Sequence, residues 1–451
     1  MRLLPQAAWT PGKAAVTSRI AIVRVAMGRG QAHDALVPPI FPILTALSHD
    51  QDAVLTFFDE RRRELPMNLQ ADWVCLSVET FAAAHAYDLA DHYRRLGVKV
   101  GLGGIHPSLL PDEAAVHADT VFVGDAEGVW PDFLRDLAAG HVAPRYDAPL
   151  DAPMVDTSGQ RAVRGYLPLS VVQLSRGCRY ACDFCSIKAL YPGRARSVSV
   201  DQAVKELADC PHKLVFIADD NLITDRVWAR QLFAAMVPLK KRWVCQVSID
   251  VASDDSLLAL MKAAGCFMVL IGFESLNPDT LRAMRKTANH VSQYRAAIAA
   301  IYRHHLMVYG TFVVGYDTDT ASTPDELQAF AEVSGFAVAN FNPLSAYPGT
   351  PLYDRLAAQG RLINPTWWLD PDYRYGQLVH RPTGATPREI EDGCRRARYG
   401  FYSLPNILRR LFREPNWRHP LVFLATNLIS AREIHRKQGQ PLNTPAKELC
   451  P

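Results

Sequence analysis

The stretch LSRGCRYACDFC, residues 174–185, holds three cysteines in a C-x3-C-x2-C spacing and constrains the chemistry of the chain more tightly than any other segment. With cysteine at about 2% of the chain, such a triplet is expected by chance roughly 0.004 times. Cys178, Cys182 and Cys185 therefore form a set. Three thiols so close together on one loop are suited to binding a metal.

The ligand type narrows the choice of metal. Cysteine sulfur binds zinc, copper(I) and iron-sulfur clusters. A structural zinc ion needs four ligands, and no nearby histidine or second cysteine pair supplies the fourth. A [4Fe-4S] cluster normally takes four cysteines, so three leave one iron open for a substrate or cofactor. Zinc remains an alternative, as do three buried structural cysteines on a loop that Gly177 allows to turn tightly.

Length and composition indicate a globular protein of two or three domains. The chain has 451 residues, 49% hydrophobic and 21% charged. A net charge of +3 is too small to suggest nucleic acid as a partner. We find no apolar run of transmembrane length and no signal-peptide core, so we expect a cytoplasmic protein. The other six cysteines are scattered, which argues against a disulfide scaffold.

Residues 18–145, after an amino-terminal tail of residues 1–17, alternate between strand and helix patterns. The predicted strands are 20–25, 53–58, 73–78, 98–102 and 120–123, with helices such as 82–96 and 130–139 between them. This alternation predicts a doubly wound parallel sheet, which binds ligands at the carboxyl ends of its strands. The residues at those ends are 77–80, 103–107 and 124–128. Their glycines allow either close approach of a ligand to the backbone or a tight turn between strand and helix.

A second alternating series follows a Pro- and Asp-rich linker, residues 146–165, and covers residues 166–360. Its predicted strands are 171–174, 214–218, 243–249, 267–273, 308–314 and 337–341. Six βα units form a partial barrel or strongly curved parallel sheet. The cysteine loop directly follows the first strand, at the carboxyl end where the active sites of barrels lie.

The region 361–451 is predicted to be helical and begins with an aromatic segment, 366–373, that includes Trp367 and Trp368. Its last part combines many arginines with apolar residues such as Leu408, Phe412 and Leu421. The pattern fits an amphipathic helical cap with a solvated basic face. It also fits contact with a membrane surface or an anionic lipid-like substrate.

These features together resemble the radical S-adenosylmethionine (SAM) superfamily. The triplet with the aromatic Phe184 before its last cysteine, placed after the first strand of a six-unit βα barrel, is similar to that superfamily's signature over roughly residues 166–360. The resemblance implies that the three cysteines hold a [4Fe-4S] cluster whose open iron chelates the amino and carboxylate groups of SAM. The reduced cluster would cleave SAM to a 5′-deoxyadenosyl radical inside a shielded barrel mouth.

Further SAM-binding positions follow from the same resemblance. The second strand ends in Ala-Asp-Asp-Asn, without the superfamily's common glycine-rich version, and the fourth in Gly-Phe-Glu-Ser, similar to a ribose-contacting motif. A carboxylate and a hydroxyl can bind ribose, or can cap the following helix. The fifth strand, 310–315, would lie flat against adenine. The implied SAM-binding residues are Phe184, Asp219, Asn221, Glu274, Ser275, Gly310 and Gly315.

The amino-terminal domain resembles the cobalamin-binding domain that precedes the barrel in one large branch of the superfamily. The implied cobalamin-binding residues are Ser77, Thr80, Gly103, Gly104, His106, Gly124 and Glu127. One departure concerns the loop after the first strand, which lacks the D-x-H-x-x-G motif of domains that ligate cobalt through histidine. His33 in that loop is therefore interpreted as a surface residue. This weakens the histidine-ligated mode more than cobalamin binding itself.

The implied function is that of a class B radical SAM methyltransferase. One SAM would methylate cobalamin, a second would yield the radical that abstracts hydrogen from an unactivated carbon, and methylcobalamin would deliver the methyl group. The layout is similar to hopanoid C-methylases and the anaerobic tetrapyrrole cyclase and methylase branch, so a polycyclic lipid or tetrapyrrole substrate is expected. An external flavodoxin- or ferredoxin-type electron donor and peripheral membrane contact are also expected.

Two alternatives remain open. A radical cyclase or oxidoreductase would use the same cofactors without methyl transfer. A non-catalytic cobalamin or iron-sulfur sensor would bind the cofactors without cleaving SAM.

Overall fold

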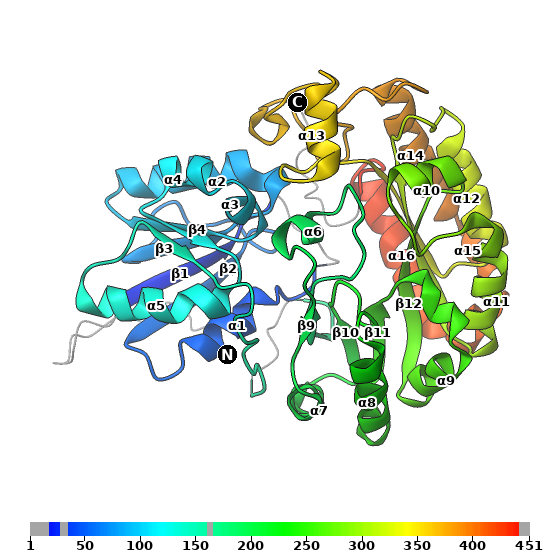
Figure 1. The fold of residues 1–451 in the computed structure, drawn as a ribbon, viewed down its shortest axis with the longest axis horizontal. Coiled ribbons are helices and arrows are strands. Elements are labelled where there is room, and N and C mark those ends of the chain that lie inside the picture. Colours follow the sequence, from blue (N-terminus) through cyan, green and yellow to red (C-terminus); the bar gives the residue numbers. More distant parts are fainter. Residues whose placement is uncertain (1–17, 28–34, 160–165, 442–451) are drawn as a thin grey trace. The chain divides into compact units, whose positions relative to one another are not determined.

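The computed structural model describes residues 18–27, 35–159 and 166–441, so the tail 1–17 and His33 lie outside the described residues. The described chain divides into two compact units. The first runs to Leu167 and includes the short segment Asp209–Pro211, and the second contains the remaining described residues from Pro168 onward. Each unit is built around its own parallel sheet (Figure 1).

The first unit is a doubly wound sheet in the order β2-β1-β3-β4-β5-β6, with every pair of neighbours parallel. This order is flavodoxin-like, with one added edge strand, and it reverses direction between β1 and β3. The strands are β1 (Ser18–Arg24), β2 (Ala53–Asp59), β3 (Trp73–Ser77), β4 (Lys99–Gly103), β5 (Thr120–Val123) and β6 (Arg145–Asp147). Strand β6 lies where the sequence predicted the linker to begin, because a three-residue edge strand carries almost no periodic signal.

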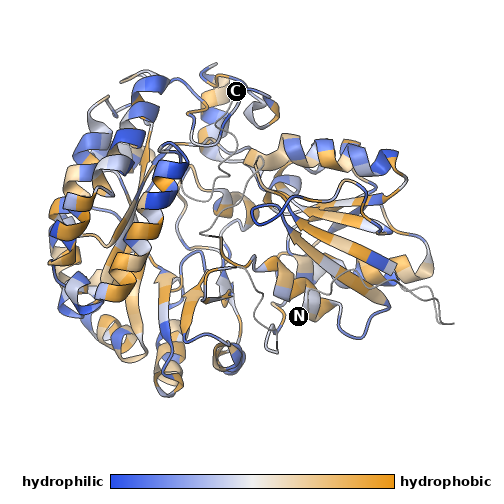
Figure 2. Cartoon of the chain, turned by 180° about the vertical axis from the view of Figure 1, so that it is seen from behind, coloured by the Kyte–Doolittle hydropathy of each residue, from blue (hydrophilic) through white to orange (hydrophobic). Residues whose placement is uncertain are grey.

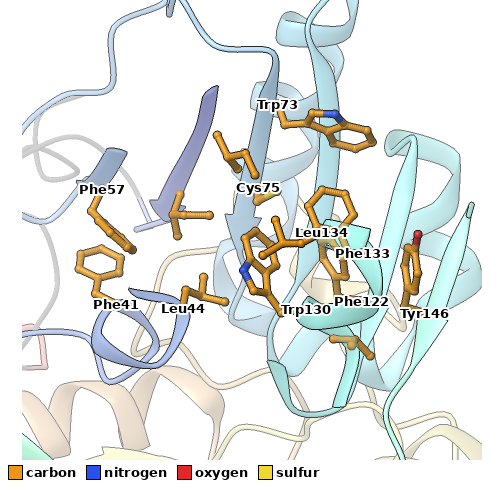
Figure 3. Close-up of a cluster of buried hydrophobic side chains, with 13 residues drawn as sticks. Phe41, Leu44, Phe57, Trp73, Cys75, Phe122, Trp130, Phe133, Leu134 and Tyr146 are labelled. Carbon is orange, nitrogen blue, oxygen red and sulfur yellow. The ribbon is translucent and has the colours of Figure 1, made fainter. Parts of the chain in front are cut away.

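Helices cover both faces of this sheet: α1 (Ile40–Leu47) and α5 (Ala126–Ala139) on one, and α2 (Ala83–Arg95) with α4 (Pro111–His117) on the other (Figure 1). The turn η1 (Thr80–Ala82) and α3 (Ile105–Leu109) follow the ends of β3 and β4. An aromatic core lies between the sheet and α1 and α5 (Figure 3). In it Trp130 and Phe133 pack on Phe122, with ring centroids 5.7 and 5.1 Å apart.

The second unit is a six-stranded parallel sheet in the order β14-β13-β12-β11-β10-β7. Its strands are β7 (Ser170–Val172), β10 (Leu214–Ile217), β11 (Arg242–Gln246), β12 (Cys266–Glu274), β13 (Met307–Val314) and β14 (Val338–Pro343). Each strand therefore pairs with the next one of the series along the chain, as in a barrel opened between its first and last strands. The parallel α/β architecture predicted from the alternating patterns is confirmed.

Helices and short turns connect and cover these strands. They are α6 (Ser186–Leu190), α7 (Val200–Asp209), α8 (Arg226–Met236), η2 (Val237–Leu239), η3 (Ile249–Ser253), α9 (Asp255–Ala263), α10 (Pro278–Ala283), η4 (Val291–Gln293), α11 (Tyr294–Arg303), α12 (Thr323–Val333) and α13 (Pro351–Ala358). Several of these helices begin directly after a residue whose side chain caps them. Asp225, for example, accepts hydrogen bonds from the amides of Val227 and Trp228 and caps α8.

The carboxyl-terminal helices belong to the same unit as the second sheet. They are η5 (Trp367–Leu369), α14 (Pro387–Phe401), α15 (Leu404–Leu411), η6 (Asn416–Arg418) and α16 (Pro420–Arg436). Helix α14 begins with a complete capping box between Thr386 and Glu389 and packs against β14 and α12. No helix in the described ranges has both the length and the hydropathy needed to cross a bilayer.

Candidate functional site

The cysteine loop lies between β8 (Ser175–Arg176) and α6, just beyond the carboxyl end of β7. Strand β8 pairs with β9 (Arg196–Ser197) in a small antiparallel ladder that holds the start of the loop. Gly177 has φ +87°, and a Cβ there would collide with the carbonyl oxygen of Arg194. Only glycine therefore allows the two segments to approach this closely.

The three thiols differ in burial and act on one another electrostatically. Cys182 is buried, whereas Cys178 and Cys185 are partly exposed. Burial raises the pKa of Cys182 to about 11, an effect that the nearby Lys286 ammonium opposes. Burial also raises the pKa of Cys185, although the amides of Ile187 and Lys188 bond to its sulfur and oppose the shift. Burial therefore favours the protonated thiols of Cys182 and Cys185, and binding of a metal would favour their thiolates.

The surroundings of the triplet fit an anionic iron-sulfur cluster. The Asn221 side-chain amide lies 3.6 Å from Cys178 Sγ and donates toward it. Such a donor and the Lys286 ammonium both stabilise negative charge on cluster sulfur. Across the described ranges, no three or more His, Cys, Asp and Glu side chains are grouped tightly enough for one metal ion. The triplet supplies three soft ligands on one anchored loop, and Asn221 and Lys286 lie beside it as donors that suit an anionic cluster.

The end of β10 holds the start of the loop. The Asp219 carboxylate accepts hydrogen bonds from the Leu174 amide at 2.7 Å and from the Ser175 hydroxyl at 2.6 Å. The neighbouring Asp220 accepts one from the Gly177 amide at 2.7 Å. Burial raises the pKa of Asp219 to about 7 despite these bonds. Asp219, predicted to contact SAM, thus has its side chain buried and bonded to the loop backbone in this structure.

Asn221 is also engaged within the protein. Besides its contact with Cys178, its side-chain amide donates to the Ser248 hydroxyl at 3.2 Å, and its oxygen accepts from the Ser248 amide at 3.2 Å. Its side chain therefore lies at the cluster loop and spans from β10 to the end of β11. This makes it a neighbour of the cysteine ligands as well as a predicted SAM contact.

Asp183, between the second and third cysteines, anchors the other side of the loop. Its fully buried carboxylate accepts from the Tyr316 hydroxyl at 2.6 Å and from an Arg355 Nη at 2.7 Å. Its amide donates to the Met284 carbonyl and its own carbonyl accepts from the Leu352 amide, both at 3.0 Å. Burial and the Asp183 carboxylate together raise the pKa of Tyr316. Four hydrogen bonds of one residue thus tie the loop to the end of α10, to α13 and to the end of β13.

At the end of β12, Glu274 forms a buried ion pair with Lys286. Glu274 Oε1 lies 2.9 Å from Lys286 Nζ, and the two side chains are 8% and 18% exposed. Glu274 has a left-handed backbone, φ 63°, at a register shift in the ladder with β13. Such a conformation is uncommon for a non-glycine residue and often marks a functional site. The adjacent Ser275 is buried, and its hydroxyl accepts from the Asn277 amide in a tight turn.

The two predicted glycines of β13 have different surroundings. Gly310 lies against the ring of Phe336, on the side of the sheet that α12 covers. Gly315 is at the carboxyl end, where its amide donates to Asp319 at 2.8 Å and its carbonyl bonds to His380 Nε2 at 2.8 Å. Gly315 therefore belongs to the same edge as the cysteine loop, together with the half-buried Phe184. Gly310 has a packing reason of its own.

In the first unit, the predicted cobalamin-binding residues gather at the carboxyl ends of β3, β4 and β5 but are not equally accessible. Ser77, Gly103, Gly104 and Glu127 are half-buried, and Gly124 is exposed. Gly104 has φ +102°, and a Cβ there would lie 2.8 Å from the backbone of Val78. Gly104 therefore has a structural reason of its own, because only a residue without a Cβ lets the end of β4 approach the backbone after β3 this closely.

The remaining two, Thr80 and His106, have buried side chains. His106 Nε2 bonds to the Tyr87 hydroxyl at 3.1 Å and to Glu113 Oε1 at 3.0 Å. These contacts hold α3 against α2 and α4, so the ring faces the interior of the unit in this structure.

The aromatic segment after α13 is a small core. Trp367 and Trp368 are 2% and 4% exposed, and Trp367 Nε1 donates to the Ala346 carbonyl at 2.9 Å. Trp367 packs on Tyr347 and Tyr373. These contacts use the tryptophan rings to hold the segment between β14 and α13 in place.

Comparisons with known proteins agree with this site. Residues 172–331 match the radical SAM superfamily. The chain is 26% identical over 400 residues to bacteriochlorophyllide d C-12(1)-methyltransferase of Chlorobaculum tepidum, covering 85% of this chain and 87% of that protein. It is 32% identical over 355 residues to hopanoid C-2 methylase of Rhodopseudomonas palustris, covering 73% of this chain and 66% of that protein.

The fold is also similar to a solved structure, that of the radical SAM methyltransferase TsrM from Kitasatospora setae with cobalamin and a [4Fe-4S] cluster bound. The TM-score is 0.61 at 16% identity, and the match covers 84% of this chain and 85% of that one. At this identity the likeness concerns the fold. The cysteine loop, the sheet that carries it and the family match identify residues 172–331 as a radical SAM domain, in a chain whose homologues include a bacteriochlorophyllide methyltransferase and a hopanoid methylase.

Proposed function

We propose that the protein is a cobalamin-dependent radical SAM C-methyltransferase acting on an unactivated carbon of a hydrophobic substrate, a polycyclic lipid or a tetrapyrrole. The observation that carries the proposal is the triplet Cys178, Cys182 and Cys185 on a loop anchored from both sides at the carboxyl ends of a six-stranded parallel sheet. Relatives named as methyltransferases of bacteriochlorophyllide and hopanoid support the reaction and the substrate class.

The three cysteines would hold a [4Fe-4S] cluster through their sulfurs. When bound, the cluster and cobalamin would supply electron transfer to SAM and a transferable methyl group. The protein's own part is to position and shield. Asp183, Asp219 and Asp220 hold the loop backbone, and Asn221 donates toward a ligand sulfur.

SAM would bind along the same edge, at Phe184, Asn221, Glu274, Ser275 and Gly315. The Lys286 ammonium and the Glu274 carboxylate, already paired, offer a cation and an anion of fixed position to the charged groups of SAM. Asp219 contributes through the loop that it holds, and Gly310 through the packing of β13.

Cobalamin would bind to the first unit, which we propose as a cobalamin-binding domain of residues 18–145. Ser77, Gly103, Gly104, Gly124 and Glu127 would line its site at the strand ends, while Thr80 and His106 support the turn beneath. The remaining proposed divisions are a linker, 146–165, a radical SAM core, 166–360, and a helical region, 361–451.

The open face of the second sheet supports a hydrophobic substrate. Along its strands, fully buried residues that face the helices alternate with half-buried residues that face the opposite side. The half-buried set includes Phe216, Val244, Leu270, Tyr309 and Val313. The same face also carries the half-buried Thr311, Asn340 and Asn342. Its apolar side chains would contact an apolar ring system, and its polar ones would orient that ring.

Further proposals concern the cellular setting. A soluble flavodoxin- or ferredoxin-type protein would supply the electron to the cluster. We also propose a cytoplasmic location with peripheral contact to a membrane, which would suit a lipid-like substrate.

The products of SAM distinguish the candidate functions. Reconstituted protein with cobalamin, reductant and candidate substrate should form S-adenosylhomocysteine together with 5′-deoxyadenosine. Formation of 5′-deoxyadenosine alone would favour the cyclase or oxidoreductase alternative, which a relative named anaerobic magnesium-protoporphyrin IX monomethyl ester cyclase of Cereibacter sphaeroides, 24% identical over 258 residues, also supports. A loaded protein that never cleaves SAM would favour the sensor.

A further inference from the structure

A group of large apolar side chains is exposed at α15, η6 and the start of α16. Phe412 is 77% exposed, Leu421 82%, Leu404 64%, Leu408 53% and Trp417 49%. Single exposed apolar residues are normal on any protein, whereas a group of them marks an interaction site. We call these five residues the α15–α16 surface.

The surface follows from the helical spacing of the sequence. Leu404, Leu408 and Phe412 are four residues apart and lie on one face of α15, while Ile407 and Arg410 on the opposite face are buried. Helix α15 contacts both η6 and α16, so the exposed side chains of the three elements come from neighbouring segments. In Figure 2 the hydrophobic colouring of α16 is concentrated in its first half.

The charges around the surface are almost all positive. Arg409 and Arg413 are exposed next to it, and Arg432 is exposed further along α16. Glu414 is the only acidic residue from 402 to 432, and it pairs with Arg418 at 2.8 Å. Arg410 is different, because it is buried and donates to backbone carbonyls, so it serves the fold.

We propose that the α15–α16 surface docks the protein on an anionic lipid bilayer. Leucine, phenylalanine and tryptophan side chains flanked by arginines are the composition of interfacial amphipathic helices. Apolar side chains enter the acyl boundary, and the arginines remain at the level of the phosphate groups. The inference does not depend on the proposed chemistry, since it rests on exposure and charge alone.

The position of the surface gives the docked protein an orientation. The side chains of Arg410, Asn416 and Asn427 donate to the carbonyls of Gly335, Phe336 and Ala337, just before β14 begins. The surface therefore lies toward the amino end of β14, whereas the cysteine loop follows the carboxyl end of β7. Docking would tether the protein and leave the carboxyl ends of the strands free.

A second copy of the chain is a poorer occupant of this surface. A two-fold symmetric contact brings the same patch of both copies together. Arg409 and Arg413 of each copy would then face the same positive rim across the interface, with Glu414 already paired to Arg418. Anionic headgroups complement that rim instead of opposing it.

The test is co-sedimentation of the full chain with lipid vesicles, without cofactors. One vesicle is pure phosphatidylcholine, and in the other part of the lipid is replaced by phosphatidylglycerol. We expect binding to the anionic vesicles that weakens at high salt. A variant with Leu408→Ser and Phe412→Ser should bind at least about tenfold more weakly, and one with Arg409→Gln and Arg413→Gln on the order of tenfold more weakly to the anionic vesicles alone.

Matched controls separate this surface from general exposure. Val227 and Val333 are 69% and 74% exposed on other helices of the same unit, and Arg135 is a largely exposed arginine of the first unit. Val227→Ser with Val333→Ser, and Arg135→Gln, should bind like the unchanged protein. No binding of the unchanged protein to anionic vesicles would overturn the proposal. Vesicle binding that is unaltered in the Leu408 and Phe412 variant would overturn it too. So would an unchanged protein that is a dimer and binds no lipid, if the same variant is a monomer.

Because this experiment needs no cluster, SAM or turnover, its failure leaves the proposed reaction untouched. Equally, a failure of SAM cleavage says nothing about the vesicles.

Discussion

Replacement of Asp183 by asparagine should loosen the cysteine loop without unfolding the domain around it. The asparagine oxygen can still accept from the Tyr316 hydroxyl, but the ion pair with Arg355 is lost. A hydrogen bond to a charged group contributes about 1.5–3 kcal/mol. The Arg355 side chain is 39% exposed and therefore partly screened, so we take the lower part of that range. Local opening of the loop should become easier by about 2 kcal/mol, which is about 30-fold in its equilibrium constant.

Native-state hydrogen exchange of the iron-free protein measures this opening directly. The Asp183 and Leu352 amides both donate within the anchor, so their exchange should speed up by about 30-fold. Asp279→Asn is the matched control, because its ion pair with Arg282 is exposed in the same unit and contributes little. Exchange that changes less than about threefold in Asp183→Asn, or equally in both variants, would refute the anchoring role.

The remaining predictions test other contacts. Burial lowers the pKa of His380 in the folded protein to about 4, whereas an unfolded histidine takes up a proton below about pH 6.5. The free energy of unfolding, measured in urea, should therefore drop between pH 7.5 and pH 5 by roughly 2 kcal/mol more in the unchanged protein than in His380→Gln. Equal drops would contradict this. Gly104→Ala should destabilise the first unit by about 2–4 kcal/mol and weaken cobalamin binding, because the added Cβ would collide with the backbone of Val78. Gly140→Ala is the control: nothing lies close to the added Cβ there, so the affinity for cobalamin should not change. Lys286→Met strands a buried carboxylate and should lower unfolding stability by about 3 kcal/mol or more; a loss like that of an exposed lysine would show that the pair is solvated.

Local sequence patterns were sufficient where the structure depends on short-range order. The cysteine triplet is recognisable from its spacing alone. The buried strands β1, β5 and β13 are recognisable from their apolar residues, so both sheets could be predicted. Strand β6 was not, because its three residues form a strand only through pairing with β5. The sequence pattern could not place Trp367 and Trp368 in a core, because aromatic residues are as suited to a core as to a binding face.

The supporting residues of the site escaped sequence reasoning because their partners are far away in the chain. Asp183 meets Arg355 across 172 positions and Tyr316 across 133. One signal was available in the sequence: Asp183 stands between Cys182 and Cys185, next to the apolar Phe184. A carboxylate buried in such a place needs a charged or hydrogen-bonding partner. Lys286 follows Glu274 by 12 positions and pairs with it only because the chain turns back after α10.

The most direct test of the central claim is the pair of SAM-derived products from the anaerobically reconstituted protein. With cobalamin, a reductant and a hopanoid or bacteriochlorophyllide substrate, S-adenosylhomocysteine and 5′-deoxyadenosine should form together, and both should vanish along with the iron in Cys182→Ala. Iron that remains bound in Cys182→Ala, or loaded protein that yields neither product, would contradict the account.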